Sequence, residues 1–179
     1  MQHRPFQRAM ARIAITIAAA LALAACGYGA GARVNTTRSI PVGLYWTSAA
    51  PIARGAYVMF CPPPAPAFDE ALRRGYIGAG FCPGGYGYMM KRVLAAAGDA
   101  VAVADDGVRV NGVLLAHSAP IAADKAGRPL PRYRSGARVL GGAQLLLMSD
   151  VSATSFDGRY FGPIDRAQVQ AVVRPIVTW

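Results

Sequence analysis

The most prominent hydrophobic feature is an uncharged run near the start of the chain. Residues 13–32 (IAITIAAALALAACGYGAGA) form a stretch of 20 positions without a charged side chain, and three arginines precede it: Arg4, Arg8 and Arg12. A basic segment followed by an apolar run of this length is typical of a signal peptide or a single membrane anchor. We therefore predict a signal or anchor over residues 1–32 and an exported domain over residues 33–179, with the N-terminus on the cytoplasmic side.

Beyond this run, short β-rich segments alternate with turn signals. The pattern predicts strands at residues 55–60, 88–95, 100–104, 108–110, 113–116, 144–148 and 168–173. Asp106-Gly107 and Asn111-Gly112 stand between such segments, as hairpin turns do. Residues 68–74 are compatible with two helical turns, and residues 124–135 form a basic, proline-containing loop. The expected fold is mostly β, a curled antiparallel sheet or barrel with one N-terminal helix.

Composition and charge narrow the class of protein. The hydrophobic share is 54%, which excludes an intrinsically disordered chain. The 19 Lys and Arg residues exceed the 9 Asp and Glu residues, so the net charge is +10. Such a charge suits nucleic acid or an anionic membrane. Export argues against nucleic acid, so we expect a membrane surface as the partner.

The cysteines fit an oxidising compartment. Cys61 and Cys82 flank a proline-rich segment and are 21 residues apart, so a disulfide between them would add about 3 kcal/mol of stability. Metal binding is disfavoured, because His117 is the only histidine after residue 32 and no CxxC motif occurs. Cys26 follows Leu-Ala-Ala, the spacing of a lipoprotein cleavage site, so a lipid anchor is the alternative to a retained helix.

Lysine is the more promising catalytic base. His117 has no reactive neighbour and is interpreted as a surface residue. Residues 33–179 contain only two lysines, Lys91 and Lys125, and Lys91 lies in the apolar segment YMMKRVLA. A desolvated lysine loses its proton near neutral pH and is then able to activate a serine. Because side chains alternate along a strand, the pattern alone leaves open whether Lys91 is buried or faces solvent.

Three motifs together resemble the bacterial type I signal peptidases. They are Ser39-Ile40-Pro41 with Gly43-Leu44-Tyr45, then Lys91-Arg92-Val93 with Gly98-Asp99, then Ser149-Asp150 with the segment Ser155 to Gly162. The Asn35-x-x-x-Ser39 spacing and the two cysteines are similar to the conjugative-transfer (TraF-type) branch of that family. Ala95, Ala97, Val151 and Gly158 depart from the usual motifs, and the large extra β-domain of the longer enzymes has no counterpart here.

The resemblance implies a role for each site residue and no cofactor. Ser39 would be the nucleophile and Lys91 the general base, with the Thr37 hydroxyl helping to bind the oxyanion. Ser155 would hydrogen-bond to the lysine amine and orient it. Asp157 is a catalytic position in this branch, although an ion pair with Arg159 explains the same two residues equally well.

The implied function is maturation of a conjugative-pilus propilin. The substrate would be held in the inner membrane, and the enzyme would face it from the periplasm as part of the conjugation (mating-pair formation) apparatus, without binding nucleic acid. The branch also implies that the substrate's own N-terminal amine resolves the acyl-enzyme, giving a cyclic pilin. Two alternatives stay open: a catalytically idle assembly subunit of that apparatus, and a lipoprotein with a structural β-domain.

Overall fold

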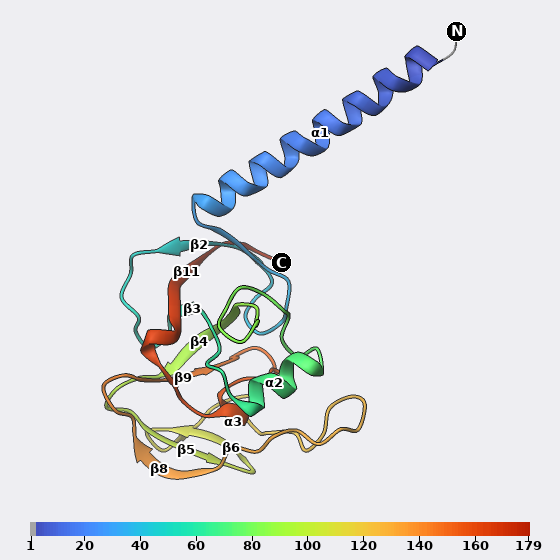
Figure 1. Ribbon diagram of the computed structural model, residues 1–179. Coiled ribbons are helices and arrows are strands. Elements are labelled where there is room, and N and C mark those ends of the chain that lie inside the picture. The colour runs from blue at the N-terminus through green and yellow to red at the C-terminus, as the bar shows by residue number, and fades with distance from the viewer. Residues whose placement is uncertain (1–2) are drawn as a thin grey trace. The chain divides into compact units, whose positions relative to one another are not determined.

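The computed structural model describes residues 3–179 and divides into two compact units, Met1–Arg33 and Val34–Trp179 (Figure 1). The first unit is dominated by helix α1 (His3–Gly29). Its segment Gln7–Gly29 has a mean hydropathy of 2.0, and none of its residues is buried. Alanine and leucine favour the helix, and a predominantly apolar helix of 23 residues is long enough to cross a bilayer. An N-terminal helix of this composition fits a signal or a membrane anchor.

The strands of the second unit form two open sheets. The larger has seven strands in the order β1-β2-β11-β3-β4-β9-β10, and every pairing from β2 to β10 is antiparallel. Its members are β1 (Ala32–Asn35), β2 (Gly43–Ser48), β3 (Tyr57–Phe60), β4 (Met89–Ala95), β9 (Gln144–Met148), β10 (Ile164–Asp165) and β11 (Val169–Thr178). The antiparallel β fold is as predicted. The barrel alternative is wrong, because each sheet of the described residues ends in two unjoined edge strands.

The second sheet lies at the end of this unit away from β2 (Figure 1). It has the order β7-β6-β5-β8, with β5 (Ala100–Ala104), β6 (Gly107–Val110), β7 (Val113–Leu114) and β8 (Ser135–Val139). The predicted Asn-Gly turn joins β6 to β7, and both of its residues have positive φ, 52° and 80°. Strand β8 is missing from the sequence prediction because most of its residues are exposed and they show no alternation.

The helices of the second unit are short. They are α2 (Pro66–Arg73), α3 (Gly158–Phe161) and the 3-10 turn η1 (Arg166–Gln168). Pro66 stands in the first turn of α2, where its missing N–H leaves no hydrogen bond unmade, and Phe68 and Ala71 face the core. Strand β11 runs beyond the predicted residue 173, because it continues along β2 past a register shift after Pro175.

A disulfide joins Cys61, directly after β3, to Cys82 in the segment that follows α2, with 5.4 Å between the two Cα atoms. Both cysteines are buried in the main core cluster, which confirms the predicted bridge. Aromatic side chains fill the same cluster, and Phe68 of α2 packs 4.8 Å from Phe161 of α3, between ring centroids. The bridge and this packing fix α2 against the larger sheet.

Candidate active site

A cleft of about 580 Å³ contains the predicted nucleophile and base. Its walls come from residues 34–39, from residues 76–78 after α2, from residues 88–91 at the start of β4, and from two loops, residues 121–130 and 152–156. Ser39, Thr37, Lys91 and Ser155 all line this cleft. Residues more than 100 positions apart in the chain are thus brought to one cavity.

Asn35 organises the loop that presents Ser39. Its side chain is buried, and Nδ2 donates to the carbonyl oxygens of Thr37 (2.7 Å), Ile40 (3.0 Å) and Pro41 (3.0 Å). On the other side of the same loop, the Tyr45 hydroxyl donates to the Pro41 carbonyl at 2.6 Å. Sequence analysis gave Asn35 no role, although its fixed spacing from Ser39 was the available signal.

The Ser39 hydroxyl has a polar neighbour in Thr37. Ser39 Oγ lies 2.7 Å from Thr37 Oγ1, and Thr37 Oγ1 lies 3.1 Å from Asn35 Oδ1. An amide oxygen only accepts and each hydroxyl has one hydrogen, so when Thr37 donates to Asn35, Ser39 donates to Thr37. The three side chains therefore form a short hydrogen-bonded chain that starts at a buried amide.

Lys91 is buried rather than facing solvent. Burial alternates along β4, and Lys91 shares the buried face with Met89, Val93 and Ala95, at 3% exposure. Desolvation lowers the pKa of Lys91 from 10.5 to about 8, against the opposing effect of the Asp157 carboxylate and with a contribution from Arg159. No carboxylate forms an ion pair with Lys91 within residues 3–179. A large neutral fraction of this amine is therefore present at mildly alkaline pH.

Ser155 lies in the same cleft as Lys91 but does not make the predicted hydrogen bond to the lysine amine. Its side chain is 7% exposed and lines the cleft. Among the described residues its Oγ has no hydrogen-bond partner, so the expected bond to the Lys91 amine is not formed. An unpaired buried hydroxyl costs about 1–3 kcal/mol.

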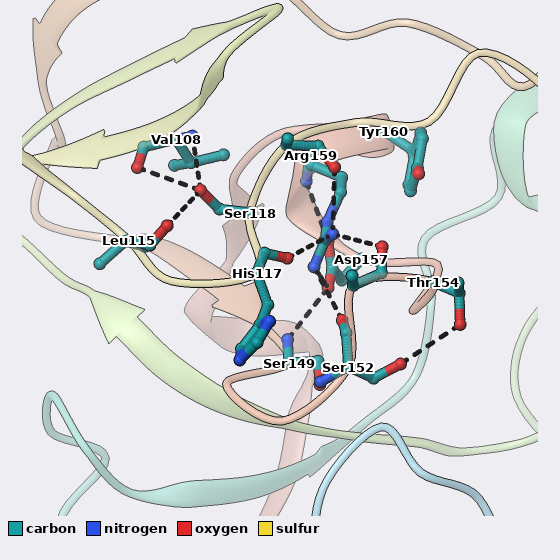
Figure 2. Close-up of polar contacts among 12 residues, drawn as sticks. Val108, Leu115, His117, Ser118, Ser149, Ser152, Thr154, Asp157, Arg159 and Tyr160 are labelled. Atoms are coloured by element: carbon teal, nitrogen blue, oxygen red, sulfur yellow. Dashed lines mark hydrogen bonds and ion pairs between the residues drawn. The ribbon is translucent and has the colours of Figure 1, made fainter.

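Asp157 and Arg159 form a fully buried ion pair outside the lining of the cleft (Figure 2). Arg159 Nε lies 2.8 Å from Asp157 Oδ1, and the Ser149 N–H donates to Asp157 Oδ2 at 3.0 Å. The second function of Arg159 is to bind backbone: Nη1 donates to the carbonyls of His117 (2.7 Å) and Ala153 (2.8 Å). Of the two interpretations of this pair, the ion pair is present, and the catalytic role of Asp157 stays a prediction.

His117 is an exposed turn residue with a φ of 54°, as predicted for a surface histidine. Its contact with the buried ion pair is made by the backbone, because its carbonyl oxygen accepts a hydrogen bond from Arg159. Among residues 3–179 there is no group of three or more His, Cys, Asp or Glu side chains placed to hold a metal ion.

Hydrogen bonds join two distant segments of the chain in one wall of the cleft. Tyr76 follows α2, and its hydroxyl donates to Asp124 in the loop of residues 121–130. Beside it, Arg74 Nη1 donates to the Pro129 carbonyl at 2.7 Å. The segment held by the disulfide is thereby attached to the basic loop, and both contribute lining residues.

The chain is similar to known proteins over most of its length. A family profile described as "Signal peptidase, peptidase S26" matches residues 7–179. A "Plasmid transfer protein TraF" of Escherichia coli is 66% identical over 174 residues, covering 97% of this chain and 98% of that one. A second protein of that name from the same organism is 75% identical over 150 residues, 84% of each chain, and a "Conjugal transfer protein TraF" of Agrobacterium fabrum is 36% identical, covering 83% of this chain and 84% of that one. Among solved structures, a signal peptidase I from Enterococcus faecalis matches with a TM-score of 0.38 and 19% identity, covering 71% of this chain and 100% of that one.

Proposed function

The chain belongs to the signal peptidase family, peptidase S26, and on this premise we propose that it is a serine endopeptidase with Ser39 as nucleophile and Lys91 as general base. The observation that carries the proposal is the burial of Lys91. Its amine has a pKa lowered to about 8 and lines the same cleft as Ser39. A lysine with this pKa has a substantial neutral fraction near physiological pH, and that form accepts a hydroxyl proton, whereas an ordinary surface lysine is almost entirely protonated.

The reaction begins with neutral Lys91. Its amine takes the proton of the Ser39 hydroxyl while Oγ attacks the scissile carbonyl, and the negative charge moves to the carbonyl oxygen. The Ser39 N–H and the Thr37 hydroxyl, 2.7 Å from Ser39 Oγ, are the donors suited to that oxyanion. As the C–N bond breaks, the Lys91 ammonium returns the proton to the leaving amine, so Lys91 is neutral again in the acyl-enzyme.

The acyl-enzyme is then resolved by a second nucleophile. Water gives a linear product with a new carboxylate, and an amine gives a new peptide bond. In both cases Lys91 takes the proton from the nucleophile and returns it to Ser39 Oγ. Attack by the N-terminal amine of the same substrate closes the product into a ring that is lighter than the linear product by one water.

Ser155 and the buried ion pair Asp157–Arg159 support this chemistry in different ways. Ser155 lines the cleft, and its unpartnered hydroxyl is suited to hold the lysine amine once substrate fills the site. Asp157 raises the pKa of Lys91 and Arg159 lowers it, so the pair acts on the amine with opposing fields. It also fixes the loop that carries Ser155, because Arg159 binds the Ser152 and Ala153 carbonyls.

The natural substrate is proposed from the relatives that carry the name plasmid or conjugal transfer protein TraF. We assign to this chain the maturation of a conjugative-pilus propilin held in the inner membrane, with cyclisation of the pilin. Residues 1–32 are then the anchor, and residues 33–179 are the exported peptidase domain facing the membrane from the periplasm. The exposed apolar surface of α1 supports this placement.

The test uses membranes that carry the full chain together with a candidate propilin. Product masses are compared for wild type, Ser39→Ala and the matched control Ser135→Ala, which changes a serine of β8 outside the cleft. We expect a processed product with wild type and with the control, and none with Ser39→Ala. Processing by Ser39→Ala at the wild-type rate would exclude the mechanism, and a wild type that processes nothing would favour an idle assembly subunit.

A further inference from the structure

The charges of the cleft are unequal. Five of its lining residues are of the charged types. Four are basic, namely Arg38, Lys91, Lys125 and Arg128, and one is acidic, Asp124. The single carboxylate, that of Asp124, already accepts hydrogen bonds from neighbouring residues. Hydrogen bonds from the Tyr76 hydroxyl, from Arg128 and from backbone N–H groups hold the pKa of Asp124 far below its usual range.

Arg128 is paired with that carboxylate, since its Nε lies 2.7 Å from Asp124 Oδ2. Arg38 and Lys125 are different. Both are exposed, and neither forms a side-chain hydrogen bond or an ion pair with any residue in the range 3–179. Among the described residues, the cleft therefore holds two cationic side chains without an anionic partner, in addition to Lys91.

We propose that Arg38 and Lys125 select substrates that carry a carboxylate near the scissile bond. This inference rests on the proposed peptidase function and defines the substrate class of that same site. An arginine next to the nucleophile offers a carboxylate a planar pair of N–H donors, and the lysine adds a second positive charge. A peptide without the anion would leave both cations unpaired, so discrimination comes from their charge rather than from cleft shape.

The position of the carboxylate follows from the chain geometry. Arg38 and Ser39 are consecutive, so their Cα atoms are about 3.8 Å apart, and an extended substrate advances about 3.3–3.6 Å per residue. The recognised carboxylate accordingly lies within about three residues of the scissile bond. Two sources supply this group: an Asp or Glu side chain, or the C-terminal carboxylate of a short leaving peptide.

A membrane surface is the competing use of the two cations. Anionic lipid headgroups also attract Arg and Lys. The cleft position favours a peptide, because both residues line the cavity that contains Ser39 and Lys91. Lipid binding is therefore treated as an outcome of the test.

The experiment measures kcat/KM of the full chain in uncharged detergent micelles, with peptides that contain an Ala-Ala scissile bond. One series carries Glu or Gln at each of the three positions on either side, and a second series ends two residues beyond the bond as an acid or an amide. We expect the carboxylate form of one series to be cleaved about tenfold better at low salt, and the preference to shrink in 1 M salt. The series that shows the preference identifies the source.

The variants assign the preference to the two residues. Arg38→Gln and Lys125→Gln should each reduce the ratio of acidic to neutral kcat/KM by about threefold, and the charge reversal Arg38→Glu should favour a Lys-containing peptide. Arg166→Gln is the matched control, because Arg166 is exposed and lies outside the cleft. It removes one positive charge from the chain and should keep the wild-type ratio.

Three results would overturn the inference. Equal kcat/KM for acidic and neutral peptides, with cleavage that depends on Ser39, leaves the peptidase function intact and removes the proposed selectivity. Absence of any cleavage that depends on Ser39 removes the peptidase function and the selectivity together. Weaker binding of Arg38→Gln and Lys125→Gln to vesicles containing phosphatidylglycerol, with an unchanged peptide ratio, would assign the cations to the membrane.

Discussion

Replacement of Lys91 by Met removes the buried amine of β4 while keeping a flexible, unbranched side chain. Methionine adapts to the space that the lysine stem occupies among Met89, Val93 and the facing strand. The substitution therefore isolates the electrostatic effect of the amine. We also expect it to abolish processing, since among the described residues the only other lysine that lines the cleft is the exposed Lys125.

The size of the effect follows from the pKa of Lys91, which burial lowers from 10.5 to about 8. At about 1.4 kcal/mol for each pH unit, the difference corresponds to about 3 kcal/mol. The pKa in the folded state lies below that in the unfolded state, so the unfolded chain binds the proton more tightly. The fold is unaffected above about pH 10.5, loses stability as the pH falls from there to about 8, and carries a constant penalty of about 3 kcal/mol below that.

Lys91→Met should therefore be more stable than wild type by up to about 3 kcal/mol at pH 7, and this advantage should disappear by about pH 10.5. Urea unfolding of the full chain in micelles, with the disulfide intact, measures both proteins at each pH. Tyr45, Tyr57 and Tyr86, whose pKa values are all raised, affect both proteins equally and cancel in the difference. A Lys91→Met protein that is less stable than wild type at every pH would show that the amine is not desolvated, and the reasoning would fail.

Three further predictions concern the site and its supports. Processing by wild type should rise about tenfold between pH 7 and pH 9, because the neutral form of a lysine with a pKa of about 8 becomes dominant over this range. Lys91→Arg should be inactive at every pH. The rate is measured in samples stopped at fixed times, and a rate that does not change with pH would contradict the prediction. Asp157→Asn should destabilise the fold by about 3–5 kcal/mol in urea unfolding, because a buried guanidinium loses its partner, and a loss of activity at unchanged stability would indicate direct catalysis instead. Gly43→Ala should lower the melting temperature, since the new Cβ would lie 2.2 Å from the Val177 carbonyl oxygen, whereas Gly136→Ala meets nothing within 4 Å and serves as the control.

The sequence was most informative where a motif and a pattern coincided. The strand around Lys91, the Asn-Gly hairpin and the disulfide were all predictable, because apolar spacing, turn chemistry and cysteine placement are local signals. The burial of Lys91 was not, because alternation along a strand leaves the choice of the buried face to tertiary packing. The same limit applies to Asn35: its spacing from Ser39 was visible, but its three carbonyl acceptors exist only after the loop has closed around it.

Strand β8 and the pair Asp157–Arg159 show two other limits. An exposed strand of a small sheet has no apolar face, so its sequence resembles that of a loop. For the acidic residue, the motif was compatible with catalysis and with an ion pair. The backbone carbonyls that also bind Arg159, those of His117 and Ala153, come from other parts of the chain, so the motif alone did not reveal these contacts.

The order of strands in the larger sheet also determines when the site is assembled. Ser39 precedes β2 and Lys91 lies on β4, and between these two strands the sheet contains β11 and β3. Strand β11 pairs with both neighbours, and it is formed by residues 169–178. Ser39 and Lys91 are therefore brought into one cleft only after residues 169–178 have been synthesised and have joined the sheet. A site built in this order is complete only when the last strand of the chain is in place, so a partly synthesised chain holds the two residues without the cleft that unites them.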